Sequence, residues 1–545
     1  MGGAGRVRAD AVVVGSGQNG LVAANMLADH GWEVVVLEVA DAPGGAVRSA
    51  EVTAPGFVSD LYSAFYPLAA ASPWIRALEL ERHGLEWTRM PAAVAHVHGD
   101  GRCALLSNDL DETCASLERF APGDGARWRE LYGEWERAGG PFLDVLFTPF
   151  PPVAPAARLA KALGGDLLRF ARWGVVPVRR VAEERFEGEG GGWLLAGNAL
   201  HADLTPDMAG SALFGLVLCG IGQQLGFPFP RGGAGRLTDA LVARFEAAGG
   251  ELRCGSLVES IEVKRGRATG VRCADGTAVE ARRAVLADVI APRLYRELLE
   301  PEHVPEKLMA DLDRFQLDNA TVKLEWALDG PIPWAADEAR RAGTVHVADG
   351  IDDLTASSGE LLRNLIPADP FLIVGQYALA DPTRAPAGCE CAWAYTHVPQ
   401  TVAGDAGDEG LTGDWESGDA ELFADRIERR MERVAPGFRD LIRARYVQTP
   451  VTLERENRNL MGGAVNGGTA QIHQQLIFRP TPGLGRAETP VRNLYLASSS
   501  AHPGGGVHGG PGANAAKAAM GSNVPASLIR AAGAVGASAG RLIRR

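Results

Sequence analysis

The sequence predicts an α/β protein in which one domain is interrupted twice by a second, α+β domain. Residues 11–37 read as a β-branched strand, a glycine-rich turn, an alanine-rich helix and a second strand, the opening unit of a parallel sheet. A second α/β block begins near Pro230, and residues 493–520 add a strand, a glycine-rich turn and an alanine-rich helix. The long stretches between these blocks hold most of the aromatic residues and the proline clusters.

We therefore divide the chain into two domains and a tail, since 545 residues exceed the ~250–300 at which a single core stops growing. The predicted first domain comprises residues 1–105, 226–295 and 485–527. The second, inserted domain comprises residues 106–225 and 296–484, and the tail is 528–545.

The composition is that of an ordinary globular protein, with 46% hydrophobic and 22% charged residues. A formal net charge of −13 argues against a nucleic-acid partner, which requires a basic surface. The longest apolar stretch, 211–222, is shorter than the ~20 residues that cross a bilayer, and the first apolar run is too short for a signal peptide. Seven scattered cysteines without a C-x-x-C pair suggest a reducing compartment, so we expect a cytoplasmic protein. We predict no metal site, because His96 and His98 lack a third ligand.

The glycine-rich turn has the pattern Gly15-x-Gly17-x-x-Gly20 between the first strand and the helix. In this pattern the first glycine permits a tight turn, the second admits a diphosphate, and the third lets helix and strand pack closely. The free N–H groups at the helix start face the anion. Glu38 ends the second strand, where an acid accepts hydrogen bonds from ribose hydroxyls. Together these features predict a Rossmann-like dinucleotide-binding domain.

The segment after Glu38 reads Asp-Ala-Pro-Gly-Gly-Ala-Val-Arg-Ser, with the glycine pair at Gly44 and Gly45. Here the sequence resembles FAD-dependent oxidoreductases of the phytoene desaturase and carotenoid isomerase type, within the amine-oxidase-like flavoprotein superfamily. The resemblance implies FAD as the cofactor and places the glycine pair along its diphosphate. Alanines replace the arginines that often flank this pair, and we expect Arg48 to take their part.

The resemblance extends over nearly the whole chain. Val258 matches the position whose backbone contacts adenine in the family. The end of the chain resembles the motif that meets the ribityl chain and the isoalloxazine ring, which implies cofactor contacts from Gly505, Gly506 and Val507. Ser498 and Ser499 replace the glycine–acid pair of many relatives, so we expect a hydroxyl or backbone N–H contact there instead of a carboxylate.

Three side chains are candidates for chemistry. Lys323 lies in a predicted strand, 320–326, that resembles the strand which places a lysine near flavin N5 through a water in amine-oxidase-like relatives. Period two puts Thr321, Lys323 and Glu325 on one face, and the alternative is a solvated face with a Lys–Glu pair. His502 and His508 flank the closing glycines, where they either touch substrate or flavin or are merely exposed.

The family implies that the flavin performs the chemistry while the protein orients the reactants and excludes water. We expect a dehydrogenase, desaturase or isomerase that moves a hydride between an apolar substrate, such as a polyene, and flavin N5. Oxygen, a quinone or another acceptor would then reoxidise the flavin. The first alternative is a flavin amine oxidase, and the second is a flavin-binding regulatory protein with little turnover. A disulfide reductase of the two-nucleotide kind is excluded, because the chain has one fingerprint and lacks a reactive cysteine pair.

Residues 155–180 are basic within an acidic protein. Six cations stand against the single acid Asp166: Arg158, Lys161, Arg169, Arg172, Arg179 and Arg180. The apolar residues between them are Leu159, Leu163, Leu167, Leu168, Phe170 and Trp173. Such a segment can lie in the interface of an anionic bilayer as a peripheral contact. The alternative is a helix of the inserted domain whose apolar face packs inward.

Overall fold

The computed structural model describes residues 7–521, so the predicted tail 528–545 and the last residues of the segment 485–527 lie outside the described residues. The first sheet has the order β10-β11-β12-β1-β2-β9, with β20 also paired to β12. Its strands are β1 (Val7–Val14), β2 (Val34–Leu37), β9 (Glu251–Arg253), β10 (Val258–Lys264), β11 (Arg267–Cys273), β12 (Ala278–Ala287) and β20 (Leu494–Leu496). β1, β2, β9, β12 and β20 are parallel, which confirms the predicted Rossmann-like domain.

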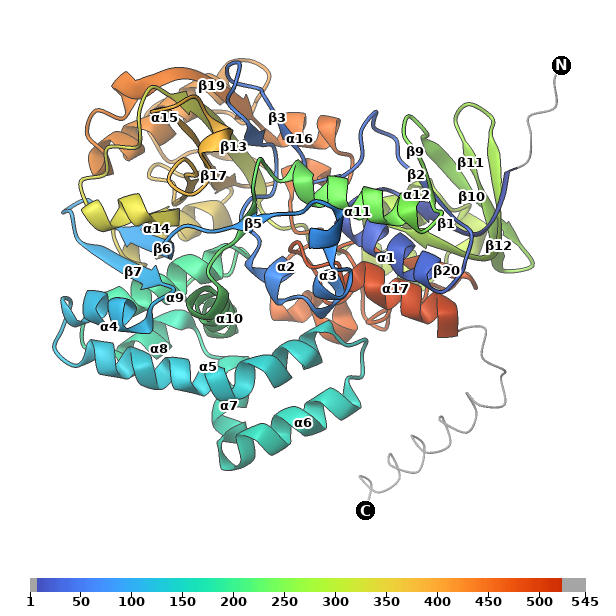
Figure 1. Ribbon diagram of the computed structural model, residues 1–545, viewed down its shortest axis with the longest axis horizontal. Helices are drawn as coiled ribbons and strands as arrows, with labels where there is room; N and C mark the ends of the chain where they lie inside the picture. The colour runs from blue at the N-terminus through green and yellow to red at the C-terminus, as the bar shows by residue number, and fades with distance from the viewer. Residues whose placement is uncertain (1–6, 522–545) are drawn as a thin grey trace.

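Helices cover both faces of this sheet (Figure 1). One face packs against α1 (Gln18–Asp29), α11 (Gly235–Ala247) and α17 (Gly510–Gly521), and the other against α12 (Ala291–Glu297) and α13 (Glu306–Leu312). Alternate residues of β1 and β12 enter the two cores, as buried parallel strands require. Because α13 belongs to this core, the first domain continues past the predicted boundary at residue 295.

The second sheet has the order β19-β13-β17-β16-β14-β6-β7. Its strands are β6 (Ala92–Val97), β7 (Cys103–Ser107), β13 (Ala320–Leu328), β14 (Ala342–Val347), β16 (Leu372–Gly375), β17 (Glu390–Val398) and β19 (Ile442–Gln448). β6 and β7 thus lie in the inserted domain, although the sequence placed residues up to 105 in the first. The reason is the parallel pairing of β6 with β14, a contact between segments far apart in the chain.

A layer of helices covers one face of the second sheet at β6 and β7 and gathers at the lower left of Figure 1. It comprises α4 (Leu110–Glu118), α5 (Asp124–Phe147), α6 (Val153–Leu163), α7 (Leu167–Trp173), α8 (Val178–Arg185), α9 (Gly190–Leu200) and α10 (Ser211–Leu225). The other face packs against α15 (Asp419–Val434), while α14 (Ile351–Leu362) contacts α9 and α16 (Pro450–Glu456) contacts β13 and β19. Short elements link the domains: β3 (Ser49–Ala50), β4 (Ser59–Asp60), β5 (Trp87–Thr88), β8 (Phe229–Pro230), α2 (Pro67–Ala71) and α3 (Pro73–Ala77).

Strand β13 shows the predicted alternation of faces. Val322, Leu324 and Trp326 pack in the core under α15. Lys323 and Glu325 point to the opposite face and are 2% and 0% exposed, because both faces of the sheet are covered. The alternative of a solvated strand face at Lys323 is therefore wrong.

The two domains are joined at the carboxylate of Asp60 in β4, which is completely buried. It accepts hydrogen bonds from Ser49 Oγ, Ala234 N and Tyr377 Oη, each at 2.8 Å. Arg384, also completely buried, completes the set with an ion pair of 3.0 Å from Nη2 to Asp60 Oδ1. Since these partners come from segments of both domains, the carboxylate fixes how the domains meet.

We expect Arg384→Leu to destabilise the protein by ~3–5 kcal/mol, because it leaves the Asp60 carboxylate buried without its cation. Urea unfolding of the variant should show this loss. The control is Arg82→Leu, which removes an exposed ion pair with Glu79 and should change stability by ~1 kcal/mol or less. Equal small effects from both substitutions would contradict the assignment of Asp60 and Arg384 as the domain joint.

Candidate active site

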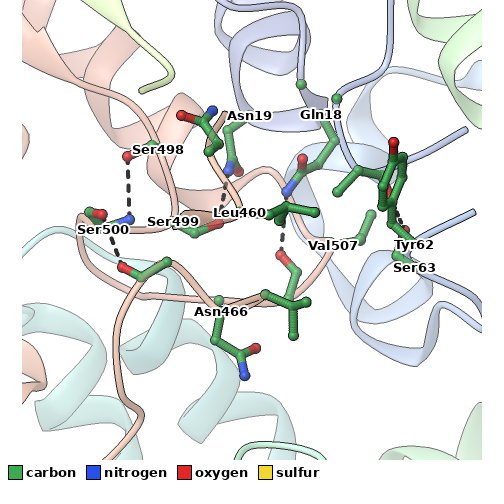
Figure 2. A pocket seen from close by; sticks show the side chains of 18 of the residues that line it. Gln18, Asn19, Tyr62, Ser63, Leu460, Asn466, Ser498, Ser499, Ser500 and Val507 are labelled. Carbon is green, nitrogen blue, oxygen red and sulfur yellow. Dashed lines mark hydrogen bonds between the residues drawn. The ribbon is translucent and has the colours of Figure 1, made fainter. Parts of the chain in front are cut away.

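A cavity of about 920 Å³ begins at the carboxyl ends of the parallel strands and extends between the helical layer and the second sheet. Figure 2 shows part of its wall, where Gln18 and Asn19 of α1 face Ser499 and the turn before Val507. Binding sites of α/β sheets lie at this edge of the sheet. The cavity is therefore lined at one end by the carboxyl edge of the first sheet, which we call the nucleotide edge, and at the other end by residues of the second domain.

The glycines of the fingerprint are required because other atoms lie so close to the backbone that a side chain would clash with them. A Cβ at Gly17 would lie 2.6 Å from Asp288 Oδ2, and one at Gly20 would overlap the carbonyl oxygen of Gly15. Gly15 itself has a φ of +96°, which residues other than glycine rarely adopt. The Gly20 N–H donates to Asp288 Oδ2 at 2.9 Å. The turn is thus a backbone surface with room for a diphosphate and none for side chains.

Glu38 lies at the cavity wall and is held in place by its neighbours. Its Oε2 accepts from the backbone N–H of Ser16 at 2.8 Å and from Ser16 Oγ at 2.7 Å, and Oε1 accepts from Ala40 N at 2.9 Å. Oε1 keeps a lone pair for a further donor. A ribose hydroxyl can therefore bind a carboxylate whose orientation is already fixed.

The glycine pair lies against the fingerprint turn. The Gly44 N–H donates to the carbonyl oxygen of Ser16 at 3.1 Å, and a Cβ at Gly45 would lie 3.0 Å from Gly17 Cα. Arg48 lines the same cavity, and its guanidinium makes no hydrogen bond or ion pair within the described residues. The two turns and this free cation form a site suited to a diphosphate.

The remaining predicted cofactor residues line the same cavity: Val258, Ser498, Ser499, Gly505, Gly506 and Val507. Asn19 Nδ2 donates to Ser499 Oγ at 3.4 Å, and Gln18 Nε2 donates to the Gly506 carbonyl at 3.5 Å (Figure 2). The Oδ1 atom of Asn19 is buried without a partner in the described residues. Hence the two glycine turns, the Glu38 carboxylate, the Arg48 guanidinium and the unpaired Asn19 Oδ1 atom belong to residues around one cavity, and these residues fit FAD.

Both predicted histidines line the cavity and are buried. His508 uses both ring nitrogens on the backbone: Nδ1 accepts from Gly510 N at 3.0 Å, and Nε2 donates to the Gly505 carbonyl at 3.1 Å. His502 donates from Nε2 to the Thr148 carbonyl at 3.1 Å, and its Nδ1 has no partner among the described residues. Burial lowers the pKa of each to about 4, so both rings are neutral at neutral pH. The geometry favours a positioning role for His508 and leaves a free nitrogen at His502.

Lys323 reaches the cavity from the second sheet. Its Nζ donates to the Asp60 carbonyl at 2.5 Å, contacts the Glu325 carboxylate and lies 5.3 Å from the centre of the Trp393 ring. Burial lowers the pKa of Lys323 from its ordinary value, and the Asp60 carboxylate opposes that shift. The lysine is therefore a buried, anchored amine at a cavity wall, with one N–H to spare.

The inner part of the cavity is bounded by two unlike walls. Apolar side chains of α5 and α10 form one: Phe142, Val145, Leu146, Leu213, Phe214, Val217 and Leu218. The second sheet forms the other with Thr321, Lys323, Thr344, Ile373, Trp393 and Tyr395. The apolar helical wall is suited to an apolar molecule.

Two further features of this site have only weak signals in the sequence. The glycine-rich loop at 466–468 lines the cavity, because the buried Arg479 donates to the carbonyls of Asn466 and Ser499 at 2.9 and 2.7 Å. Asp318 fixes the same loop by accepting from the N–H of Asn466 at 2.8 Å. The other is Asp288, whose only signal is an acid at the carboxyl end of a strand that pairs with β1.

Comparisons with known proteins agree with this geometry. The family model described as flavin containing amine oxidoreductase matches residues 20–338. The mouse protein named pyridine nucleotide-disulfide oxidoreductase domain-containing protein 2 is 30% identical, over 93% of this chain and 92% of its own. One of the limonene dehydrogenase polypeptides of Castellaniella defragrans is 25% identical, over 94% and 95% of the two chains.

The phytoene desaturase (lycopene-forming) of Pseudescherichia vulneris is 26% identical, over 91% of this chain and 96% of its own. Among solved structures, an oxidoreductase from Methanosarcina mazei superposes with a TM-score of 0.61 at 15% identity, covering 94% of this chain and 100% of the other. This likeness supports the fold described above.

We expect Glu38→Ala to weaken FAD binding by ~1.5–3 kcal/mol, because it removes a charge-assisted hydrogen bond to the ribose. The dissociation constant measured by flavin fluorescence should rise about tenfold or more. Glu33→Ala is the control, since Glu33 is exposed and pairs with Arg282. An unchanged affinity in Glu38→Ala would mean that this acid does not bind the cofactor.

Asp288 predicts a pH dependence of FAD binding. Burial raises the pKa of Asp288 to about 7, although the hydrogen bond from Gly20 N opposes the shift. Below that pH the carboxyl is neutral. Above it a negative charge lies against the fingerprint turn, where it would repel a bound diphosphate. FAD affinity should therefore fall as the pH rises through about 7 in the native protein and change less in Asp288→Asn. The same pH profile in both proteins would contradict this role.

Proposed function

Because the chain belongs to the flavin containing amine oxidoreductase family and is an FAD-dependent oxidoreductase of the phytoene desaturase type, we propose that it moves a hydride between an apolar substrate, such as a polyene, and flavin N5. The observation that supports this is one cavity with a nucleotide-binding half and a half walled by apolar helices. Bound FAD supplies the hydride acceptor or donor. The polypeptide supplies orientation and excludes water.

Side chains of this protein that line the cavity would bind and orient the groups around the reacting atoms. We expect the spare N–H of Lys323 Nζ to donate to a water or to a substrate group at the sheet wall of the cavity. His502 offers a second, neutral nitrogen in the same cavity. Two relatives have names that refer to limonene and phytoene, and the apolar wall of α5 and α10 supports a substrate of comparable polarity. Oxygen or a quinone is the proposed electron acceptor.

Anaerobic reduction of the bound flavin tests this function. Apolar alkenes, added in micelles to the FAD-loaded protein, should bleach the flavin absorbance, and admission of oxygen or a quinone should restore it. Bleaching by amines and not by alkenes would replace the proposal with a flavin amine oxidase, the alternative that the same family model allows.

Lys323→Met should slow flavin reduction or reoxidation by roughly 10²-fold while FAD stays bound, since a positioned proton donor or acceptor contributes about that much. Stopped-flow measurement of both half-reactions checks this expectation. The matched control is Lys264→Met, because the Lys264 side chain is 62% exposed in the first domain. Native rates in Lys323→Met would remove this lysine from the reaction.

The basic segment 155–180 has features of both interpretations, an inward-packing helix and a contact with a bilayer. Leu163, Phe170 and Trp173 are buried, and Arg158 and Arg172 pair with acids, as an inward-packing helix requires. Lys161 and Arg169 make no ion pair with the described residues, and several apolar side chains are exposed: Val153, Leu167, Leu168, Val175, Ile472, Leu476, Ile477 and Phe478. A Cβ built on Gly210 would lie 3.1 Å from both the Gly174 carbonyl oxygen and Ile472 Cγ2, so the segments 153–175 and 472–478 approach each other at this point.

We therefore propose a peripheral contact between this surface and an anionic bilayer, next to the cavity wall formed by Ile472 and Leu476. None of the described helices is long and apolar enough to cross a bilayer. The protein should sediment with anionic liposomes at low salt, and the double variant Leu168→Glu, Phe478→Glu should not. Leu362→Glu, at an exposed site on α14, is the control. Failure of the native protein to sediment at low salt would contradict the contact.

A further inference from the structure

The sheet wall of the cavity carries polar side chains that a pure hydrocarbon ligand could not hydrogen-bond. In the antiparallel pair β13 and β17, Lys323 lies opposite Tyr395, and Tyr395 lies opposite Ile373 of β16. Residues paired in this way share one face of a sheet, and this face looks into the cavity. Thr321, two residues before Lys323, extends the same face. We call Thr321, Lys323 and Tyr395 the polar floor.

The polar floor has hydrogen-bonding capacity that the described chain does not use. Thr321 is 3% exposed, and its Oγ1 is buried without a partner among the described residues. The hydroxyl of Tyr395 makes no hydrogen bond to them, although its ring stacks on Trp393 at 6.0 Å. Lys323 has one unused N–H after its bonds to Asp60 and Glu325. Buried polar atoms without partners are rare in folded proteins, so Thr321 Oγ1, with the free groups of Tyr395 and Lys323 on the same face, points to a ligand.

The charge on the floor limits which polar group can bind. The ammonium of Lys323 is already paired with the Glu325 carboxylate, so the pair has no net charge to neutralise an anion. A protonated amine has only N–H donors, so it cannot accept from the N–H of Lys323. The free groups are two hydroxyls, which donate or accept, and one N–H, which donates. A neutral oxygen is the partner that all three can bind.

We propose that the substrate is an apolar molecule that carries a neutral oxygen function, a hydroxyl or a carbonyl, and that the polar floor binds this oxygen. The inference rests on the proposed function, because it specifies the substrate class of the same cavity. The apolar body then lies against α5 and α10, on the opposite wall. A pure hydrocarbon would fill the cavity but leave the hydroxyls of Thr321 and Tyr395 without partners, which weakens its binding.

Binding to the FAD-loaded protein tests the inference without turnover. The probes are a medium-chain ketone, the alcohol, the carboxylate, the primary amine and the alkane of equal length, each displacing an apolar fluorescent dye. The ketone and the alcohol should bind about tenfold more tightly than the alkane, the factor that corresponds to a hydrogen bond of ~1.4 kcal/mol. The carboxylate and the amine should bind more weakly than the ketone.

The variants Thr321→Val and Tyr395→Phe should each lower ketone affinity about tenfold and leave alkane affinity unchanged. Tyr132→Phe is the control, since Tyr132 lies on α5 outside the cavity lining. Equal affinity for ketone and alkane, tightest binding of the amine, or variants that weaken both ligands alike would overturn the inference. Selective ketone binding without flavin reduction by any substrate would refute the proposed function alone and leave the polar floor in place.

Discussion

The site depends on one buried carboxylate. Asp60 has no exposed surface, and a charge so placed must be paired, so it holds Ser49, Ala234, Tyr377 and Arg384 around it. These partners come from both domains, and the Asp60 carbonyl also accepts from Lys323. The relative position of the nucleotide edge and the sheet wall of the cavity is therefore set by the need to satisfy this charge.

The cavity divides its chemistry between backbone and side chains. At the nucleotide end, the two glycine turns lie so close together that no side chain fits between them. The groups available to bind a diphosphate are therefore backbone N–H groups and Arg48. At the inner end, α5 and α10 present hydrocarbon while the sheet presents hydroxyls and an amine. The first division selects FAD, and the second favours an apolar molecule held at one polar point.

Local patterns predicted the local parts of this site. Gly15, Gly17, Glu38 and Gly45 line one cavity, and because they lie within 31 residues of one another their proximity could be predicted from the sequence. The assignment of β6 and β7 failed because it depends on pairing with β14, more than two hundred residues away. Alternation on β13 predicted which residues share a face, but it could not show that Asp60 of the first domain covers Lys323, so that this face is buried as well.

A crystal structure of the FAD-loaded protein with a long-chain ketone tests the central claim most directly. We expect the flavin ring between the turn at Val507 and the polar floor at Lys323. The ketone should lie against α10, with its oxygen within hydrogen-bond distance of Thr321 or Tyr395. A ring placed elsewhere, or a ketone bound outside the cavity, would contradict it.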